Sequence, residues 1–251
     1  MEKRLNVRLL SYTPNPEKLV AAAAKLCYSN SSIDDLLKKQ TPERAREFIG
    51  KLMEMGHESP IEHIVYNFGI EGISRACSHQ LVRHRHASYS QQSQRYVDEQ
   101  SDRSKDRCFD FIVPETIEKI GLENEFMQDM STIQRMYDKW HKKLEEAGLR
   151  GEEVHQDARY VLPNAAETKI MVTMNARSLL NFFKLRMCNR AQWEIRNLAF
   201  EMYKLVFPTA PTLFAYVGPS CVSKDRCEEG KFSCGKKKEV RKKFDELKKL
   251  H

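Results

Sequence analysis

The amino-acid sequence predicts a single α+β domain in which helices flank a central antiparallel sheet. Apolar and polar residues alternate in "IVYNFGIEGI", residues 64–73, and in "ETKIMVTM", residues 167–174, as they do in half-buried strands. Longer stretches before, between and after these segments carry apolar residues at helical spacing. Neither an internal repeat nor a Gly/Ser-rich or Pro-rich linker divides the 251 residues, and a chain of this length can bury a substantial core.

The N-terminal part of the chain predicts two helices that begin with a proline. Asn15 is placed to cap a helix over residues 15–27, with Pro16 in its first turn. Thr41 and Pro42 repeat this arrangement in a second helix, which Gly56 ends. The other predicted elements are a polar turn at "HESPIEH", residues 57–63, a short helix over 74–82, one long or two shorter helices over 115–147, and helical structure from Ser178 to about Phe207.

The formal net charge of +7 is concentrated at the C-terminus. Residues 236–251 hold eight Lys/Arg and three Asp/Glu, so the body of the chain carries only +2. A basic surface over the whole molecule is therefore not expected, and neither is nucleic acid as a partner. Val240, Phe244, Leu247 and Leu250 form a narrow apolar stripe at helical spacing, which favours a basic helix docked on its own body over one that contacts a membrane or nucleic acid.

The remaining bulk properties are those of a cytoplasmic protein. The N-terminal residues "MEKRLNVRLL" lack the apolar core of a signal peptide, and no apolar run is long enough to span a bilayer. The seven cysteines are odd in number and widely spaced, so they do not indicate the disulfide framework of a secreted protein. We therefore expect a cytoplasmic protein without membrane contact.

Three of the cysteines, Cys221, Cys227 and Cys234, lie in a Lys-rich C-terminal extension predicted over residues 218–251. Together with Cys188 they leave a four-cysteine zinc site open as an alternative. The C-x2-C spacing typical of such sites is absent. We expect these cysteines to be structural and predict no metal site.

A polar segment near the middle of the chain, "RHRHASYSQQSQRY" at residues 83–96, suggests a binding site. Arginine stays charged near neutral pH, and its planar guanidinium suits bidentate contact with phosphate or carboxylate. Serine hydroxyls add small donors for phosphate oxygens, and glutamine amides can pair with the edge of a nucleobase. Phosphate-binding groups beside base-binding groups indicate a nucleotide-like ligand.

Three other interpretations of this segment are weaker. Arginine-rich loops are commonly just solvated, but the density of donors here exceeds what such a loop needs. His84 and His86 are spaced to share one face of a strand and bind a metal ion, but Arg83 and Arg85 would repel it. A serine near a histidine suggests a nucleophile, but no G-x-S-x-G turn surrounds any of these serines.

A second polar group lies in "NARSLLNFFKLRMCNRAQWE", residues 175–194. Two pairs of residues four apart share a helix face: Arg177 with Asn181, and Arg186 with Arg190. Asn175 and Ser178 lie where the helix begins, where backbone donors suit an anion. Partly buried arginines need anionic partners, either a ligand or internal carboxylates such as Glu194. Arg159 in "DARYVLP" carries the same ambiguity.

These segments resemble the flavin-dependent thymidylate synthases. "RHRHASYSQQS" matches the family signature of R-H-R, seven residues and then S. The companion segments "HESPIEH", "QLVRHR", "SQRY", "ARYVLP" and "NARSLLNFFKLR" follow the order found in the family. The resemblance covers roughly residues 5–217, which we take with the preceding residues as the main domain, 1–217.

The resemblance implies a homotetramer whose active sites form where subunits meet. It also implies bound FAD, reduction by NADPH, and conversion of dUMP to dTMP with 5,10-methylenetetrahydrofolate as carbon donor and without a cysteine nucleophile. The alternative that the residues alone leave open is a basic nucleotide- or RNA-binding protein without redox chemistry.

The resemblance also implies which residues form the site. The implied flavin contacts are Ser59, Arg83, His84, Arg85, Gln91, Asn175, Ala176, Arg177 and Asn181, with His57 as a further flavin-side residue. The implied nucleotide contacts are Gln80, Leu81, Val82, Arg83, Arg159 and Arg186, together with Gln91, Gln92, Ser93, Gln94 and Arg95 of a neighbouring subunit. Arg186 is the implied catalytic residue, because a fixed guanidinium beside uracil stabilises negative charge that develops on the ring. Ser93, Gln94 and Arg95 are the implied phosphate cradle.

Two positions depart from the family pattern. Position 91 is Gln where relatives often have Glu, so hydrogen bonding is retained there and an acid role is put in doubt. Position 190 is Arg where some relatives carry His near the flavin ring, so a proton-transfer role is lost there. Neither change removes a group on which the predicted binding depends.

Overall fold

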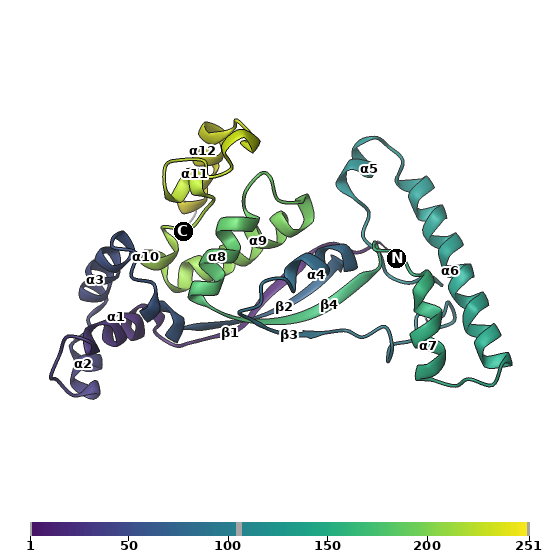
Figure 1. Cartoon of the computed structure of the whole chain (residues 1–251), viewed down its shortest axis with the longest axis horizontal. Helices are drawn as coiled ribbons and strands as arrows, with labels where there is room; N and C mark the ends of the chain where they lie inside the picture. Colours follow the sequence, from purple (N-terminus) through teal and green to yellow (C-terminus); the bar gives the residue numbers. More distant parts are fainter. Residues whose placement is uncertain (1, 104–106, 250–251) are drawn as a thin grey trace. The chain divides into compact units, whose positions relative to one another are not determined.

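The structure, a computed structural model, describes residues 2–103 and 107–249; of residues 248 and 249 it describes only the backbone. Within these residues four strands form one sheet in the order β1 (Asn6–Tyr12), β2 (Val65–Ser74), β4 (Glu167–Asn175) and β3 (Ser88–Gln91) (Figure 1). Paired side chains run in opposite order along β1 and β2: Asn67 donates to Ser11, and Asn6 donates to Glu71. Helices combined with an antiparallel sheet confirm the predicted α+β class.

The chain divides into two compact units, each discontinuous in the sequence. The first unit comprises the described residues of Met1–Asn6, Ile70–Arg83 and Tyr89–Met171, and the second those of Val7–Gly69, His84–Ser88 and Val172–His251. Each of the four strands contributes residues to both units. The extension 218–251 falls within the second unit, so the boundary predicted at residue 217 does not coincide with this division.

The first unit carries α4 (Arg75–Leu81), α5 (Glu115–Lys119), α6 (Glu123–Glu146), α7 (Glu152–Ala158) and the 3-10 helix η2 (Arg159–Val161). Its core comprises Phe109, Phe111, Val113, Met130 and Ala166, which are all buried. Of the two arrangements predicted for 115–147, the structure has two helices. They are separated near Gly121, whose φ of 72° lies in the left-handed region that glycine adopts without strain. The short helices over 74–82 and 115–119 and the long α6 thus follow the apolar spacing.

The second unit carries α1 (Pro16–Leu26), α2 (Ile33–Lys39), α3 (Pro42–Glu54), η1 (Ser59–His63), α8 (Ala176–Arg186), α9 (Trp193–Val206), η3 (Phe207–Thr209), α10 (Pro211–Phe214), α11 (Ser220–Ser223), η4 (Gly230–Phe232) and α12 (Lys237–Lys249). Aromatic rings join these helices: Phe183 of α8 packs edge-on against Tyr203 of α9 and Phe214 of α10, with centroid separations of 5.8 and 6.3 Å. This packing fixes α8, which carries the predicted residues Arg177, Asn181 and Arg186.

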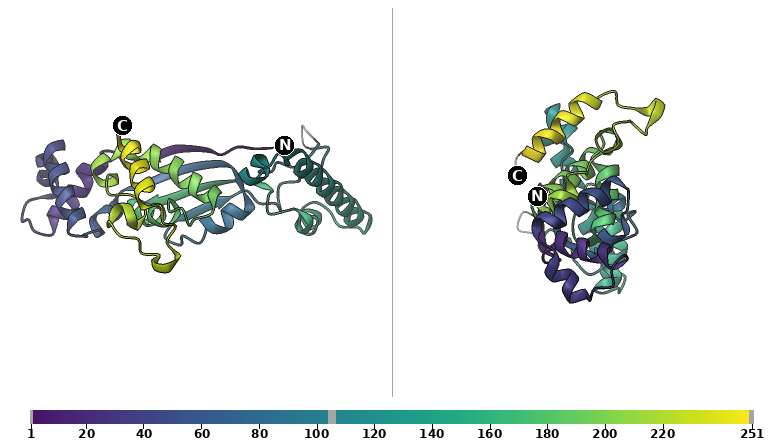
Figure 2. Two further views of the ribbon diagram at one scale, coloured as in Figure 1. Left: turned by 90° about the horizontal axis from the view of Figure 1, so that it is seen from above. Right: turned by 90° about the vertical axis from the view of Figure 1, so that its left-hand side faces the viewer.

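The C-terminal helix α12 docks on the second unit, as the apolar stripe predicts. In both views of Figure 2 this helix is the last, yellow part of the ribbon. Phe244 is fully buried against Phe200 and Tyr203 of α9, with centroid separations of 5.7 and 6.4 Å. Val240 is buried as well, whereas Leu250 of the predicted stripe lies outside the described residues. In the part of the chain that the structure describes, none of the helices has the length and apolarity needed to cross a membrane.

The ends of α3 are those predicted. The Thr41 hydroxyl accepts a hydrogen bond from the Arg44 N–H. At the other end Gly56 adopts a φ of 73°, its N–H donates to the Met53 carbonyl, and the His57 N–H donates to the Leu52 carbonyl. These two bonds form a Schellman motif, which requires a left-handed residue at Gly56.

Asn15 lies at the N-cap position of α1, but the predicted side-chain cap is wrong. Asn15 adopts a left-handed conformation, with φ 47°, and its side chain makes no capping hydrogen bond. Only its backbone carbonyl accepts, from the Leu19 N–H. Asparagine tolerates this conformation better than most residues, so the position remains compatible with the sequence.

Several other predictions need correction. "HESPIEH" is not simply a polar turn, because Ser59–His63 form the 3-10 helix η1 around the fully buried Ile61. The helical segment predicted from Ser178 to Phe207 is interrupted between α8 and α9. Elements that the sequence patterns did not predict include β1, β3, α2, α7, α10 and α11.

Candidate active site

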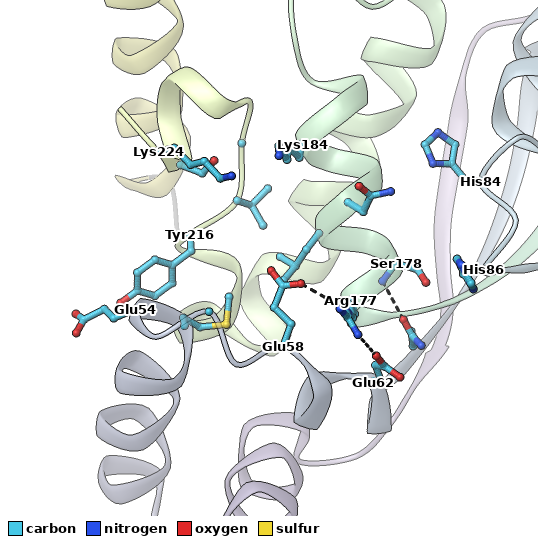
Figure 3. Close-up of a pocket in the computed structure, with 18 of the residues that line it drawn as sticks. Glu54, Glu58, Glu62, His84, His86, Arg177, Ser178, Lys184, Tyr216 and Lys224 are labelled. Carbon is cyan, nitrogen blue, oxygen red and sulfur yellow. Dashed lines mark hydrogen bonds and ion pairs between the residues drawn. The ribbon is translucent and has the colours of Figure 1, made fainter. Parts of the chain in front are cut away.

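The second unit contains a pocket of about 890 Å³ (Figure 3). It is lined by the end of α3 and the turn that follows, by η1, by segment 84–86, by α8 and by segment 216–224. Five of the predicted flavin contacts line it: His84, Arg85, Asn175, Arg177 and Asn181. The volume lies in the range of small-molecule and cofactor sites, roughly 300–1,000 Å³.

Arg177 is held on one side of this pocket by two carboxylates. Its Nη1 donates to Glu62, and its Nε lies 3.3 Å from Glu58 Oε2 (Figure 3). The hydrogen bond to Glu62 is the main cause that raises the pKa of Arg177. Of the two partners that the sequence analysis left possible for this arginine, a ligand or internal carboxylates, the structure shows internal carboxylates.

Arg186, the last residue of α8, has a different partner. Its Nε donates to His84 Nε2 at 2.9 Å. Among the described residues no carboxylate oxygen lies within ion-pair distance, 4.0 Å, of the Arg186 guanidinium, and its Nη atoms make no hydrogen bond. The charge of Arg186 thus has no internal counter-ion in this unit, so it can attract an anionic ligand.

His84 is held as a neutral imidazole. Burial, followed by the positive charge of Arg186, lowers the pKa of His84 to about 4. Its ring also packs edge-on against Phe182, with centroids 4.9 Å apart. The Nε2 of a neutral ring can accept a hydrogen bond from the Arg186 Nε–H, which orients the guanidinium plane.

Two lysines add positive charge to the pocket. Lys184 and Lys224 lie on the side of it opposite Glu54, Glu58 and Glu62 (Figure 3). Both lysines contact Glu228, each at 2.9 Å, and hydrogen bonds from Lys224 and then Lys184 lower the pKa of Glu228 to about 2. One carboxylate shared by two ammonium groups leaves this side of the pocket basic.

The sequence prediction missed both lysines. A signal was available for Lys184, since it follows Arg177 by seven residues and Asn181 by three, on the same helix face. Lys224 carries no comparable signal, because only the fold brings residues 216–224 to α8.

The beginning of α8 corrects one expectation. The Asn175 side chain accepts from the Ser178 N–H at 2.9 Å, and the Ala176 N–H donates to the Ile64 carbonyl at 2.9 Å. The prediction of open backbone donors for an anion is therefore wrong for these two N–H groups. Ala176 is fully buried and does not line the pocket, so the structure gives no support to its predicted flavin contact.

Two further predicted flavin residues in the second unit do not line the pocket. Ser59 and His57 are both exposed. Ser59 begins η1, and His57 completes the Schellman motif of α3. The other predicted flavin residues, Arg83 and Gln91, belong to the first unit.

Gln91 and the chain after it are anchored to β4 in the first unit. The Gln91 amide donates to the Ser78 and Thr168 hydroxyls at 3.0 and 3.1 Å. Arg75 donates to the Gln92 carbonyl at 3.2 Å and to Thr168 at 3.3 Å. Burial first, and then the charge of Arg159, lowers the pKa of Arg75. Arg75 was not predicted, because no spacing in the sequence relates it to Gln92.

The predicted phosphate cradle is a tight turn. The Ser93 carbonyl accepts from the Val97 N–H at 3.0 Å, and the Ser93 hydroxyl accepts from the Arg95 N–H at 3.2 Å. Arg95 is exposed and forms an ion pair with Glu152 at 3.2 Å. The Arg159 Nε donates to the Gln156 carbonyl at 3.1 Å. Both arginines thus have protein contacts that still leave donors for a ligand.

The polar segment 83–96 is accessible throughout. All fourteen residues are described, and none of them is buried. Of the predicted nucleotide residues before it, Leu81 has a fully buried side chain, and its carbonyl accepts from the Tyr89 hydroxyl at 2.9 Å. Gln80 is partly exposed, and Val82 and Arg83 are exposed. The Gln91 amide and the Tyr89 hydroxyl of this segment donate within the chain, whereas Arg83 and Arg85 are exposed and accessible to a ligand.

The four cysteines of the alternative zinc site lie near one another: the Cys221 thiol interacts electrostatically with Cys188, Cys227 and Cys234. All seven are free thiols, and among the described residues no three cysteine sulfurs lie within 4.8 Å of one another. Burial, together with the neighbouring cysteines, raises the pKa of the Cys188 and Cys221 thiols. The prediction that these four cysteines bind no metal stays a prediction.

A cofactor-sized pocket with four cationic side chains, Arg85, Arg177, Lys184 and Lys224, is typical of the class of proteins that bind an anionic small molecule. Comparison with known proteins identifies the family within this class. The family model described as "Thymidylate synthase complementing protein" matches residues 8–212. A flavin-dependent thymidylate synthase from Clostridium tetani is 51% identical over 95% of this chain and 96% of its own length. The enzyme of the same name from Geobacter sulfurreducens is 49% identical over 97% of this chain and 99% of its own length. The one from Pyrococcus horikoshii is 37% identical over 90% of this chain and 90% of its own length. The chain therefore belongs to the flavin-dependent thymidylate synthase family.

Proposed function

We propose that this chain converts dUMP to dTMP with bound FAD, NADPH as reductant and 5,10-methylenetetrahydrofolate as carbon donor. The observation that carries the proposal is Arg186, a guanidinium oriented by neutral His84 and without an internal counter-ion in its unit. The family membership supports the reaction class. It gives no support to the alternative of a nucleotide- or RNA-binding protein without redox chemistry. The expected cytoplasmic location stays a prediction.

The pocket of the second unit fits a flavin dinucleotide in size and in chemistry. Arg85, Lys184 and Lys224 supply cations for its phosphates, and the amides of Asn175 and Asn181 supply donors and acceptors for its polar rings. Arg177, which is paired with Glu58 and Glu62, supplies a further cation to the pocket. Bound FAD supplies the hydride of the reaction after reduction by NADPH. Ser59, Ala176, Arg83 and Gln91 complete the proposed set of flavin contacts.

We propose that the nucleotide is held mainly by the first unit's residues. Ser93, Gln94 and Arg95 bind the phosphate of dUMP, with Arg159 as a further cation. The backbone of Gln80, Leu81, Val82 and Arg83 and the amides of Gln91 and Gln92 contact its sugar and base. Arg186 then stabilises negative charge on the uracil ring, because its planar fork can approach two acceptors at once.

We propose a homotetramer in which active sites are shared between subunits. Large apolar side chains are exposed on several elements: Tyr160 at 84%, Met171 at 54% and Leu185 at 50%. Tyr160 directly follows Arg159, and Leu185 directly precedes Arg186. Covering such side chains by another subunit would remove apolar area from water close to the proposed ligands.

The role of Arg186 is tested with Arg186→Lys, which keeps the charge and removes the planar fork. We expect kcat to fall by about 100-fold or more, the cost of losing one fixed transition-state donor, while the FAD bound per chain stays unchanged. Arg196→Lys is the matched control, since Arg196 is also partly buried and donates to the Asn189 carbonyl. Unchanged dTMP formation by Arg186→Lys would refute the assignment.

A further inference from the structure

A second cluster of chemical groups lies in the first unit, outside the candidate active site. Asp98, His141 and His155 each offer one potential metal-ligand atom, and these atoms all lie within 4.8 Å of one another. His141 Nε2 lies 3.8 Å from Asp98 Oδ1, and His155 Nε2 lies 3.7 Å from Asp98 Oδ2. We propose that these three residues bind one divalent transition-metal ion.

The environment of His141 supports a ligand role. Its side chain is only 4% exposed, and neither ring nitrogen has a hydrogen-bond partner among the residues that the structure describes. Leaving a buried polar group unpaired is destabilising, so such groups are rare unless something outside the protein satisfies them. A metal ion on Nε2 would provide the missing partner.

The second ring nitrogen of each histidine faces an acceptor. His141 Nδ1 lies 3.5 Å from Glu145 Oε2, one helical turn along α6. His155 Nδ1 lies 3.3 Å from the carbonyl of Arg95. Metal-ligating histidines typically direct their other N–H to a carboxylate or a backbone carbonyl, which fixes the tautomer. Both histidines therefore present Nε2 to the same point beside Asp98.

The distances and charges also suit a metal. Ligands of a tetrahedral Zn²⁺ at roughly 2.0–2.1 Å lie about 3.4 Å apart. The two distances from the histidine Nε2 atoms to Asp98, 3.8 and 3.7 Å, are close to this value, and the three ligand atoms lie within 4.8 Å of one another. Two imidazoles and one carboxylate suit Zn²⁺ or Fe²⁺, whereas Mg²⁺ prefers oxygen ligands. The Arg103 guanidinium lies 3.9 Å from Asp98 Oδ2, but its side chain is 71% exposed and can move away.

The bound ion would fix the predicted phosphate cradle. Asp98 follows the Ser93–Val97 turn, while His141 belongs to α6 and His155 to α7. His155 also contacts the Arg95 carbonyl, so one metal joins the turn to both helices. This role rests on the proposed function of Ser93 and Arg95 in binding dUMP, whereas the metal site itself does not.

The site is tested on the full-length chain without an affinity tag. After treatment with a chelator, the protein is titrated calorimetrically with Zn²⁺, with Fe²⁺ under anaerobic conditions, and with Mg²⁺. We expect one Zn²⁺ or Fe²⁺ and no Mg²⁺ to bind per chain. Loss of a group that hydrogen-bonds a metal ligand typically weakens metal affinity by about 10–100-fold. We therefore expect Glu145→Gln to weaken metal affinity by this factor, and His141→Gln or His155→Gln to weaken it more.

Two controls identify the ligands. His63→Gln removes an exposed histidine and should leave metal affinity unchanged. A Co²⁺-loaded sample should lack the charge-transfer absorption of a thiolate ligand, which distinguishes this site from the cysteines. Circular dichroism tests whether each variant is folded. If His141→Gln does not fold, His155→Gln serves as the test instead, because His155 is less buried.

The outcomes are distinct. Failure of the native chain to bind Zn²⁺ and Fe²⁺, or retained binding in both histidine variants, would overturn the metal site and leave a cluster of histidines and carboxylates. If metal binds but the KM for dUMP is the same in stripped and loaded enzyme, the role in fixing the cradle is overturned. Calorimetry needs no substrate, so it remains decisive even if dTMP is not formed.

Discussion

The Arg186–His84 hydrogen bond joins a permanently charged guanidinium to an imidazole that stays neutral. Because burial and the neighbouring charge lower the pKa of His84 to about 4, protonating this ring is more costly in the folded chain than in the unfolded one. The stability gained from neutral His84 is thus complete above its usual pKa of 6.5 and is lost as the pH falls from there towards 4.

This pair gives the first prediction. In an NMR titration of the folded chain, the His84 ring should remain neutral down to about pH 5. In Arg186→Leu its pKa should rise but stay below 6.5, since burial is the larger cause. A His84 that titrates near 6.5 in the native chain would contradict the geometry of this pair.

The pKa of Glu99, in the first unit, is raised, whereas that of His84 is lowered. Burial, with repulsion from Asp110 and Glu167, raises the pKa of Glu99 from 4.5 to about 7. Protonated Glu99 is favoured by folding, so its contribution to stability is complete below pH 4.5 and is lost as the pH rises through 7.

Replacing Glu99 by Gln should therefore stabilise the chain at alkaline pH. At pH 8 we expect the free energy of unfolding to rise by up to about 3 kcal/mol, and at pH 4.5 we expect little change. Denaturant unfolding at both pH values measures this difference. Glu153→Gln, at an exposed position of α7, is the control and should show no such pH-dependent gain.

At the scale of elements, β2 depends on one glycine. Gly72 has a φ of 69°, and a Cβ at this position would lie 1.9 Å from the Arg4 carbonyl oxygen. Gly72→Ala should therefore destabilise the chain by several kcal/mol, because backbone must move to admit the methyl group. Gly69→Ala on the same strand is the matched control, since its new methyl would meet only the Leu10 side chain at 3.4 Å. Equal thermal stability of the two variants would contradict this register of β1 and β2.

The elements also show which parts of the fold the sequence can predict. β2 and β4 alternate between buried and less buried residues, so periodicity finds them. β1 has no fully buried residue, and β3 is the polar stretch Ser88–Gln91, held in place by bonds from Gln91 and Gln92 to residues of β4. Strands stabilised by tertiary hydrogen bonds leave no apolar pattern in the sequence.

The same limit applies to the sites. Arg186, His84 and Asn181 belong to motifs of fixed spacing, so the sequence finds them. Lys224 reaches the pocket only through the packing of the C-terminal segment, and Asp98, His141 and His155 come from three separate segments. No local spacing relates such residues, so only the fold brings them together.

At the scale of the whole molecule, shared active sites predict complementation between subunits. Arg186→Lys and the double variant Ser93→Ala, Arg95→Ala remove groups that we assign to different subunits of one site. Each variant alone should form little dTMP, whereas mixed tetramers obtained by co-expression should contain some sites with neither defect. Activity of the mixed tetramers clearly above that of either variant is expected, and no recovery would indicate that each site is built within one subunit.

The central claim is that this chain makes dTMP through a bound flavin. The direct measurement is dTMP formation from dUMP and 5,10-methylenetetrahydrofolate by the purified chain, with and without added FAD and NADPH. We predict dTMP only when both FAD and NADPH are present, and loss of the product when either is omitted from flavin-free enzyme. Formation of dTMP by flavin-free enzyme, or none by a chain that has bound FAD and all substrates, would contradict the account.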